Sequence, residues 1–341
     1  MPTNKLPSKR AITIKDVANI AAVSPATVSR VVSGKIVSSQ LKQRVLEAVQ
    51  TTGYRPNLAA RRLRAKTSDT IGLIIADIRN PFFTRIARAI DDIAKTHGQH
   101  VILCNTDENP AREKAYLDLM EEENVAGIIL AATLSTIKNP RQIVTTRPLI
   151  LIDRKPQKPL YDAVVIDNRE GAKKLVRHLY HHGRKHIVCL YGATSTTGLE
   201  RQKGYQEAME ELGLCPETYP VQHAQETWPL PLKTLLDKHP LPDALVVTNG
   251  VLALKVATFL QNAAIYVPEK IALAAFDDEP WMKLVFNGLT TIAQPIRDIA
   301  SETYHGLIER LANPQKPVSQ TVLSSELVIR GSTLKTLAPL A

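Results

Sequence analysis

Residues 12–34 read ITIKDVANIAAVSPATVSRVVSG, and this stretch decides the fold of the N-terminal part of the chain. Apolar residues recur at helical spacing on both sides of a short polar break at Ser24. The hydroxyl groups of Thr13 and Ser24 can accept hydrogen bonds from the free N–H groups that begin each helix, and Pro25 suits a first helical position. The helical runs predicted here are Ile14–Ala22, Ala26–Val32 and Ser39–Thr51. The pattern therefore predicts a small helical head that contains a helix-turn-helix.

The second of these helices would present a polar face to solvent. The residues on that face are Pro25, Ala26, Thr27, Ser29 and Arg30. The first turns of such a helix can reach base edges and phosphates in the major groove, and the guanidinium of Arg30 can bind a guanine with two hydrogen bonds. The side chains of Pro25 and Ala26 cannot form hydrogen bonds with bases. Arg30, apolar contacts and contacts to phosphates would therefore carry a larger share of the specificity for the DNA sequence. The alternative is a generic three-helix bundle with a polar surface.

The positive charge of the chain is concentrated in this head. The net charge is +10, and residues 1–66 hold 13 Lys and Arg against only Asp16 and Glu47, a balance of +11. The other 275 residues carry 30 basic and 31 acidic groups and sum to −1. A compact basic module on a neutral body is typical of a nucleic-acid binder, because cationic side chains displace the counterions of phosphates. A basic tail that only aids solubility is the alternative.

A short connecting segment follows the head. Residues 55–69 read RPNLAARRLRAKTSD, in which Asn57 can cap a helix at Leu58–Arg64 before a polar linker. This helix is shorter than the roughly 12 to 15 residues that an isolated helix needs in water. We therefore expect it to fold only with help from its surroundings.

From Ile71 onward, short aliphatic runs alternate with amphipathic helices, which is typical of βαβ units and parallel sheets. A first group of strands is expected at Ile71–Ala76, Val101–Asn105, Gly127–Ala131 and Pro148–Ile152. A second group is expected at Ala163–Ile166, Ile187–Tyr191, Ala244–Thr248 and Ile271–Phe276. The helices between them are predicted at Phe82–His97, Ala111–Glu122, Gly171–His181, Leu199–Leu212 and Gly250–Asn262. The sequence contains no visible internal repeat.

The predicted fold class is therefore α/β, with an all-α helix-turn-helix head and hinge helix followed by two Rossmann-like, doubly wound parallel-sheet lobes. The head would cover residues 1–56, the hinge and linker 57–69, and the body 70–341. The first lobe would take about 70–167 and 298–330, and the second about 168–297 and 331–341. Ligands bind beyond the carboxyl ends of such strands, so two facing lobes predict a ligand cleft.

Several function classes are disfavoured by the sequence. The chain lacks a G-x-S-x-G elbow, a P-loop, a G-x-G-x-x-G motif and a metal-spaced cluster, so we expect neither an enzyme nor a bound cofactor or metal. Cys104, Cys189 and Cys215 have no C-x-x-C spacing, which fits a reducing cytoplasm. No export signal or apolar stretch of membrane length is visible, so secretion and membrane insertion are not expected.

Two further alternatives concern binding proteins. A periplasmic sugar-binding protein would share the two-lobed body, but it would need an export signal and would lack the basic head. A purely architectural DNA-binding protein would not need a neutral body with a cleft.

The chain resembles the lactose-repressor/galactose-repressor (LacI/GalR) family over essentially its whole length. The motifs that carry this resemblance, in family order, are TIKDVA (13–18), YRPN (54–57), NPFF (80–83), FDD (276–278) and LTTIAQP (289–295). It implies a periplasmic-binding-protein-like body and a sequence-specific transcriptional regulator, most often a repressor. Its partners would be a pseudo-palindromic double-stranded DNA operator, a small sugar-like effector and a second copy of the chain.

The resemblance also implies a role for the hinge. Two hinge helices brought together on DNA would place Ala60, Arg61 and Arg64 along the minor groove, and Asn57, which can cap this helix, is also expected to belong to the DNA-binding residues. In the family, the leucine that matches Leu63 is wedged between base pairs. Leu63 packed on the head, with the arginines in solvent, is the alternative. Only a short tail, Ser332–Ala341, follows Gly331, which is too short for a heptad-repeat tetramerisation helix, so a homodimer is expected.

The family's effector contacts match Phe82, Arg201, Asn249 and Asp277 here, and Arg154 is a further candidate. Arg201 and Asp277 suit sugar hydroxyls, and Arg154 suits a carboxylate. The stretch FDDEPW (276–281), followed by GLTTIAQP (288–295), is most similar to members that respond to gluconate or 2-ketogluconate-type sugar acids. Trp281 is expected to line the site, and the alternative is a core position, which is more common for a buried tryptophan. Taken singly, each charged residue is more typical of a solvated loop or a local ion pair. This sequence has Gly250 where many members carry an acidic residue after the Asn, which departs from their hydroxyl-binding network.

Overall fold

A computed structural model describes residues 12–32, 36–54, 68–222, 228–237 and 240–334. The chain divides into two compact units, Met1–Ser68 and Asp69–Ala341, which are described separately. The hinge residues Asn57, Ala60, Arg61, Leu63 and Arg64, and the expected helix that contains them, lie outside the described residues. No helix in the described ranges has both the length and the apolar character that crossing a membrane requires.

The N-terminal unit consists of α1 (Ile14–Ile20), α2 (Pro25–Val32) and α3 (Ser39–Thr52). Its apolar core is formed by the buried side chains Val17, Ala18, Ala21, Val28, Val31, Val45 and Ala48. Ser24 caps α2 as predicted, because its Oγ accepts the N–H of Thr27 at 3.1 Å. Thr13 is the N-cap residue of α1, as predicted, and forms a capping box with Asp16. The N–H and the hydroxyl of Thr13 both donate to the carboxylate of Asp16 at 2.7 Å, and an acidic side chain in the first turn also suits the helix dipole.

The turn between α1 and α2 is fixed from α3. Ala22 adopts a φ of 46°, a left-handed conformation that non-glycine residues adopt rarely. Arg44 of α3 donates through Nη2 to the carbonyl oxygens of Ala21 at 2.7 Å and Ala22 at 3.1 Å. The guanidinium thus satisfies the carbonyl groups at the end of α1 and holds the helix-turn-helix angle from the third helix.

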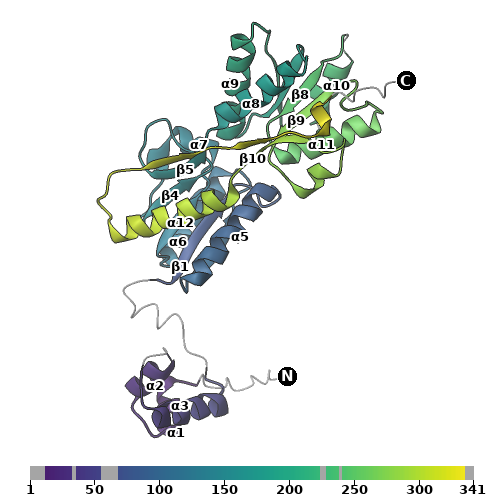
Figure 1. The fold of residues 1–341 in the computed structure, drawn as a ribbon. Coiled ribbons are helices and arrows are strands. Elements are labelled where there is room, and N and C mark those ends of the chain that lie inside the picture. Colours follow the sequence, from purple (N-terminus) through teal and green to yellow (C-terminus); the bar gives the residue numbers. More distant parts are fainter. Residues whose placement is uncertain (1–11, 33–35, 55–67, 223–227, 238–239, 335–341) are drawn as a thin grey trace, which may run out of the picture. The chain divides into compact units, whose positions relative to one another are not determined.

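The second unit contains two six-stranded sheets, one in each lobe (Figure 1). The first sheet comprises β1 (Thr70–Ile75), β2 (His100–Asn105), β3 (Gly127–Leu130), β4 (Leu149–Ile152), β5 (Asp162–Ile166) and β11 (Gln320–Leu323). The second comprises β6 (Ile187–Gly192), β7 (Glu217–Val221), β8 (Ala244–Val247), β9 (Ala272–Phe276), β10 (Thr290–Ala293) and β12 (Glu326–Val328). The central strands are buried along their whole length, which explains their nearly continuous aliphatic sequences.

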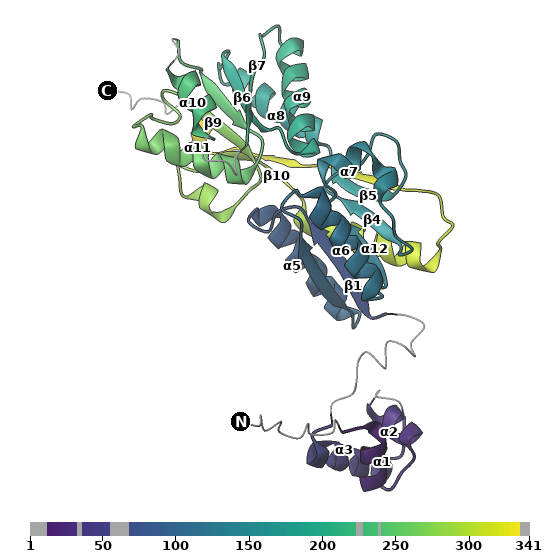
Figure 2. The ribbon, with the colours of Figure 1, turned by 180° about the vertical axis from the view of Figure 1, so that it is seen from behind.

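Helices cover both faces of each sheet, as the opposite views in Figures 1 and 2 show. In the first lobe, α5 (Pro81–Thr96) and α12 (Ile296–Ala312) pack together on one face, and α6 (Pro110–Glu122) packs on the other. In the second lobe, α8 (Asn168–His181) and α9 (Thr196–Glu211) share one face, opposite α10 (Pro229–Leu236) and α11 (Gly250–Asn262). Four short helices are α7 (Leu134–Lys138), η1 (Pro140–Gln142), η2 (Pro280–Lys283) and η3 (Gly331–Thr333).

Three details of the sheets correct the sequence analysis. Strand β5 was grouped with the second set of strands, but it pairs with β4 in the first sheet, in line with the predicted first lobe of 70–167. Strand β12 pairs with β10 in the second sheet, so residues 326–330 leave the first lobe to which they were assigned. This pairing is antiparallel, so the second sheet is not purely parallel. Such strands are placed by distant partners, and their own residues do not reveal which sheet they join.

The two sheets repeat one design. Their strand orders are β2-β1-β3-β4-β5-β11 and β7-β6-β8-β9-β10-β12, so each strand of one lobe has a counterpart in the other. Asp153 follows β4 and Asp277 follows β9, at equivalent positions, and both have a left-handed φ, 69° and 72°. The repeat is therefore structural, although the sequence shows none.

Candidate functional site

The polar face of α2 that is predicted to contact DNA lies on the surface of the N-terminal unit. On α2, Pro25, Ala26, Ser29 and Arg30 are exposed and Thr27 is half-buried. Val28 and Val31 point the other way into the core. The side of α2 that carries Val28 and Val31 therefore faces the core, and the opposite side faces solvent. The residues named from the sequence on this helix thus share one accessible face.

A cavity of about 310 Å³ lies between the two lobes of the second unit. Five of the six predicted effector residues line it, namely Phe82, Arg154, Arg201, Asn249 and Asp277. The other lining residues are Asp77, Arg79, Asn80, Phe83, Asp107, Glu108, Asp153, Gly192, Thr194, Ser195, Thr197, Gln222 and Gln294. They follow the carboxyl ends of strands in both sheets, where parallel sheets bind ligands.

Arg201 is a buried cation of the second lobe, with 3% of its surface exposed. Its Nε donates to Oδ1 of Asn168 at 2.7 Å, and Nη1 donates to the carbonyl oxygen of Thr248 at 2.6 Å. The guanidinium carbon lies 4.1 Å from the ring centre of Phe276. Burial lowers the pKa of Arg201, against the opposing effect of the carboxylates of Asp277 and Asp153. The two hydrogen bonds and the ring contact therefore hold the guanidinium rigidly at the cavity wall.

Asp277 and Asn249 face the cavity from neighbouring strand ends. Oδ1 of Asp277 accepts a hydrogen bond from Nε2 of Gln294 at 2.6 Å, and Oδ2 accepts one from the N–H of Gly250 at 2.8 Å. Oδ1 of Asn249 caps α11 by accepting the N–H of Leu252 at 2.8 Å, which leaves its amide group to act as a donor. Each carboxylate or amide is fixed by the backbone yet keeps capacity for a ligand hydroxyl.

Gly250 is part of this arrangement. A Cβ at this position would lie 3.3 Å from both Cβ and Oδ2 of Asp277. An acidic side chain at this position would crowd and repel Asp277. The glycine that replaces the family's acidic residue is therefore consistent with the hydrogen bond between the Gly250 N–H and the Asp277 carboxylate.

Arg154 lines the cavity, but its charge is already neutralised within the first lobe. Its Nη1 and Nη2 donate to the carboxylate of Glu108 at 2.7 and 2.5 Å, and Nε donates to Asp153 at 3.1 Å. Burial alone would lower the pKa of Arg154, but Glu108 and then Asp153 raise it. The sequence suggested a free cation for a carboxylate, whereas the structure shows a buried ion-pair network.

The apolar side of the cavity is formed at the start of α5. Oδ1 of Asn80 caps this helix by accepting the N–H of Phe82 at 3.1 Å, and Pro81 follows at the first helical position. The ring of Phe82 is held edge-on to that of Phe83, with 5.0 Å between ring centres. This anchoring directs an aromatic surface toward the polar groups of the second lobe.

Trp281 does not line the cavity. It is half-buried and packs against the apolar core between the second sheet and α11. Its neighbour Glu279, 3% exposed, instead connects the lobes, because Nη1 of Arg85 on α5 lies 3.4 Å from its carboxylate. Burial raises the pKa of Glu279, and Arg85 opposes that rise. The motif FDDEPW thus contributes Asp277 to the cavity and Glu279 to lobe contact, while its tryptophan is structural.

The sequence analysis did not assign Asp153, Glu108, Thr197 or Gln294 to the cavity. Gln294 follows β10, a four-residue strand that was not predicted. Asp153 holds a position equivalent to Asp277 in the repeated fold, and burial raises its pKa against the opposing effects of Arg154 and Arg201. A matching of strand ends between the lobes would have identified Asp153.

Two family models match this chain, one within each of its two units. Residues 13–57 match the family model of bacterial regulatory proteins, lacI family, and residues 176–333 match a periplasmic binding protein-like domain. The chain is 32% identical over 327 residues to a ribose operon repressor of Halalkalibacterium halodurans, covering 94% of this chain and 97% of that protein. It is 33% identical over 332 residues to the HTH-type transcriptional regulator DegA of Bacillus subtilis, covering 94% and 98%.

A solved structure confirms the predicted fold class. The crystal structure of the lac repressor dimer bound to operator and the anti-inducer ONPF matches with a TM-score of 0.85 and 24% identity, covering 95% of this chain and 100% of that one. The relatives are transcriptional regulators and not enzymes, in agreement with the prediction for this chain.

Proposed function

This chain belongs to the lacI family of bacterial regulatory proteins, and on that premise we propose that it is a repressor whose hold on DNA is set by a sugar or sugar acid. The match over residues 13–57 makes it a DNA-binding transcriptional regulator and disfavours a periplasmic sugar-binding protein. We infer that it acts in the cytoplasm as a homodimer on a pseudo-palindromic operator, because one head reads only a half-site. The exposed face of α2 would carry the base contacts, with Arg30 as the principal polar reader.

The observation that carries the effector proposal is the set of fixed polar groups around one small cavity. Arg201, Asp277 and Asn249 are each held by hydrogen bonds to the protein, so they are preorganised for a ligand. Carboxylates and amides suit the hydroxyl groups of a sugar, and the ring of Phe82 suits its C–H face. A volume of about 310 Å³ is at the lower end of small-molecule sites and suits a single sugar unit.

Two effector classes compete for this cavity. The resemblance of FDDEPW to responders of gluconate-type acids supports gluconate or 2-ketogluconate, with the effector carboxylate at Arg201. The pairing of Arg154 with Glu108 favours a neutral sugar instead, because it leaves no second uncompensated arginine for a carboxylate. The similarity to a ribose operon repressor supports a sugar in either case.

Titration calorimetry with the full chain tests this proposal. Gluconate, 2-ketogluconate and a neutral hexose are titrated into the wild type, an Asn249→Ala variant and an Asn109→Ala control. Both substitutions remove a helix-capping asparagine, since Asn109 caps α6, but only Asn249 lines the cavity. Loss of a ligand hydrogen bond should weaken binding by about tenfold in Asn249→Ala alone.

Tight binding of the neutral sugar and of neither acid would replace the sugar-acid assignment with the neutral one. Equal affinities in the two variants and the wild type would contradict the location of the site.

A further inference from the structure

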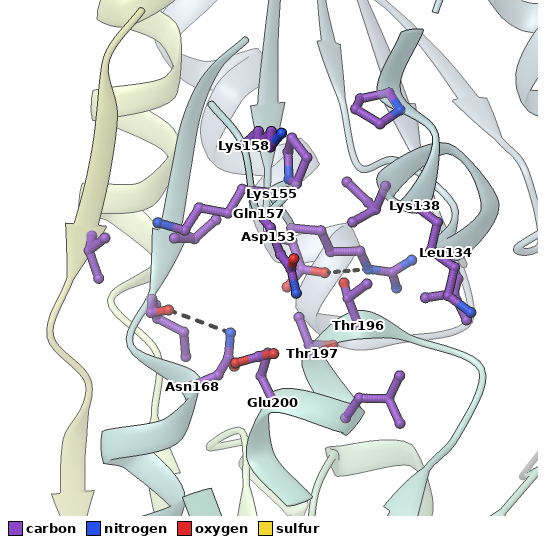
Figure 3. A pocket seen from close by; sticks show the side chains of 18 of the residues that line it. Leu134, Lys138, Asp153, Lys155, Gln157, Lys158, Asn168, Thr196, Thr197 and Glu200 are labelled. Carbon is purple, nitrogen blue, oxygen red and sulfur yellow. Dashed lines mark hydrogen bonds and ion pairs between the residues drawn. The ribbon is translucent and has the colours of Figure 1, made fainter. Parts of the chain in front are cut away.

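A second and larger cavity lies beside the first (Figure 3). Its volume is about 1020 Å³, and it shares Asp153, Arg154 and Thr197 with the smaller cavity. One wall comes from the first lobe, at α7, η1 and the loop between β4 and β5. The opposite wall comes from the second lobe, at the starts of α8 and α9. The proposed sugar site accounts for none of the remaining lining residues.

The lining of this cavity carries a net positive charge, which is distributed unequally between its two walls. Seven cationic side chains and three carboxylates line it, an excess of four positive charges. In the second lobe the cations are neutralised, because Arg169 pairs with Glu200 and Glu207 at 2.6 and 3.1 Å, and Lys203 pairs with Glu200 at 3.3 Å. The excess therefore lies on the first-lobe wall.

Apart from Arg154, which pairs with Glu108 and Asp153, the cations of that wall have no acidic partners in the part of the chain that the structure describes. Lys138, Arg141 and Lys158 form no ion pair there, and Lys155 donates only to the neutral amide oxygen of Gln320, at 3.1 Å. These positive charges lie on one wall and repel each other, and an anion bound between them would reduce that repulsion.

The second-lobe wall supplies hydrogen-bond donors. Helix α9, 16 residues long, begins here at Thr196, and the first N–H groups of a helix lack partners within it. Oγ of Ser195 accepts the N–H of Gly198 and contacts the hydroxyl of Thr197, so those groups are occupied. The hydroxyl oxygen of Thr196 is buried and finds no hydrogen-bond partner among the described residues. Figure 3 shows Thr196 and Thr197 at the cavity wall below Asp153. This oxygen is covered in the structure, so an anion in the cavity would reach it only after a rotation of the Thr196 side chain, which no hydrogen bond of the hydroxyl opposes.

We propose that this cavity is a second ligand site that binds a small polyanion, either a phosphorylated metabolite or a polycarboxylate, between the first-lobe cations and the start of α9. The ligand would contact both lobes, so it would favour one arrangement of them. Because the two cavities share residues, the polyanion and the sugar would alter each other's affinity reciprocally. The inference concerns a separate set of residues and does not rest on the identity of the sugar.

The test uses calorimetry on the full chain with inorganic pyrophosphate and, separately, citrate. Wild type is compared with a Lys138→Gln/Lys158→Gln variant and with a Lys114→Gln control. Lys114 is an exposed lysine of α6 that pairs with Asp118 and lines neither cavity. Polyanions that bind the basic head do so equally in all three proteins, so the difference between them reports on the cavity alone.

We expect at least one of the two polyanions to bind wild type and the control alike, and to bind the double variant at least about tenfold more weakly. Which of the two binds identifies the class of anion. A Thr196→Val variant, similar in shape but without the hydroxyl, should also lose affinity, and it replaces the double variant if circular dichroism shows that the latter is unfolded. Equal affinities in all the proteins, or no binding of either polyanion to wild type, would overturn the proposal.

Discussion

At the scale of single residues, His178 is a buried histidine on α8 that the ligand sites do not use. Its Nε2 lies 2.8 Å from the hydroxyl of Thr333, and its ring centre lies 4.3 Å from that of His182. Burial, followed by the charges of His182 and His181, lowers the pKa of His178 from 6.5 to about 4. The unfolded chain therefore takes up a proton in this range that the folded chain does not. We expect the free energy of unfolding to fall as the pH drops from 6.5 toward 4, by at most about 3 kcal/mol from this residue.

Urea unfolding between these pH values checks this expectation. A His178→Gln variant should show a smaller loss of stability on acidification than wild type, whereas a His305→Gln variant, changed at an exposed position on α12, should behave like wild type. The same pH dependence in all three proteins would show that the protonation of His178 is not coupled to folding.

At the scale of elements, α8 and α9 approach each other closely at Gly204. A Cβ at this position would lie 2.6 Å from Cα of Arg169 and would also press against the carbonyl oxygen of that residue. Both atoms belong to the backbone of α8, which cannot move aside as a flexible side chain can. In an open helix, Gly→Ala stabilises by up to about 1 kcal/mol, but overpacking costs about 1–3 kcal/mol or more. We expect Gly204→Ala to lower the free energy of unfolding, and Glu210→Ala, exposed on the same helix, to change it little. Thermal unfolding midpoints decide the sign, and a stabilised Gly204→Ala would refute the contact.

The elements also show what the sequence predicted and what it did not. The buried central strands were predicted because their aliphatic runs are nearly continuous, and the helices between them because each shows an apolar face. Strands β11 and β12 were missed since they have only four and three residues and are half-buried, so no periodicity marks them. In the cavity, Phe82, Arg201, Asn249 and Asp277 were found through family motifs. The pairing of Arg154 with Glu108 and the core position of Trp281 depend on distant contacts, which no local pattern encodes.

At the scale of the whole molecule, the proposed function requires a coupling between the basic head and the two-lobed body. Residues 1–66 carry a net charge of +11, so affinity for any duplex should fall steeply as salt rises from about 50 to about 200 mM. This electrostatic contribution to the affinity is the same for all DNA sequences, so it cannot by itself make DNA binding depend on a ligand. The regulated part must come from ligand contacts that differ between arrangements of the lobes, typically about 1–3 kcal/mol of coupling.

The most direct measurement is the affinity of the full chain for a genomic fragment selected by its own binding, compared with a random duplex, with and without gluconate, 2-ketogluconate or a neutral hexose at fixed salt. We expect the selected fragment to bind more tightly than the random one, and one of these ligands to change the affinity for it by at least about fivefold. Identical affinity for both duplexes, unaltered by every ligand, would contradict the account.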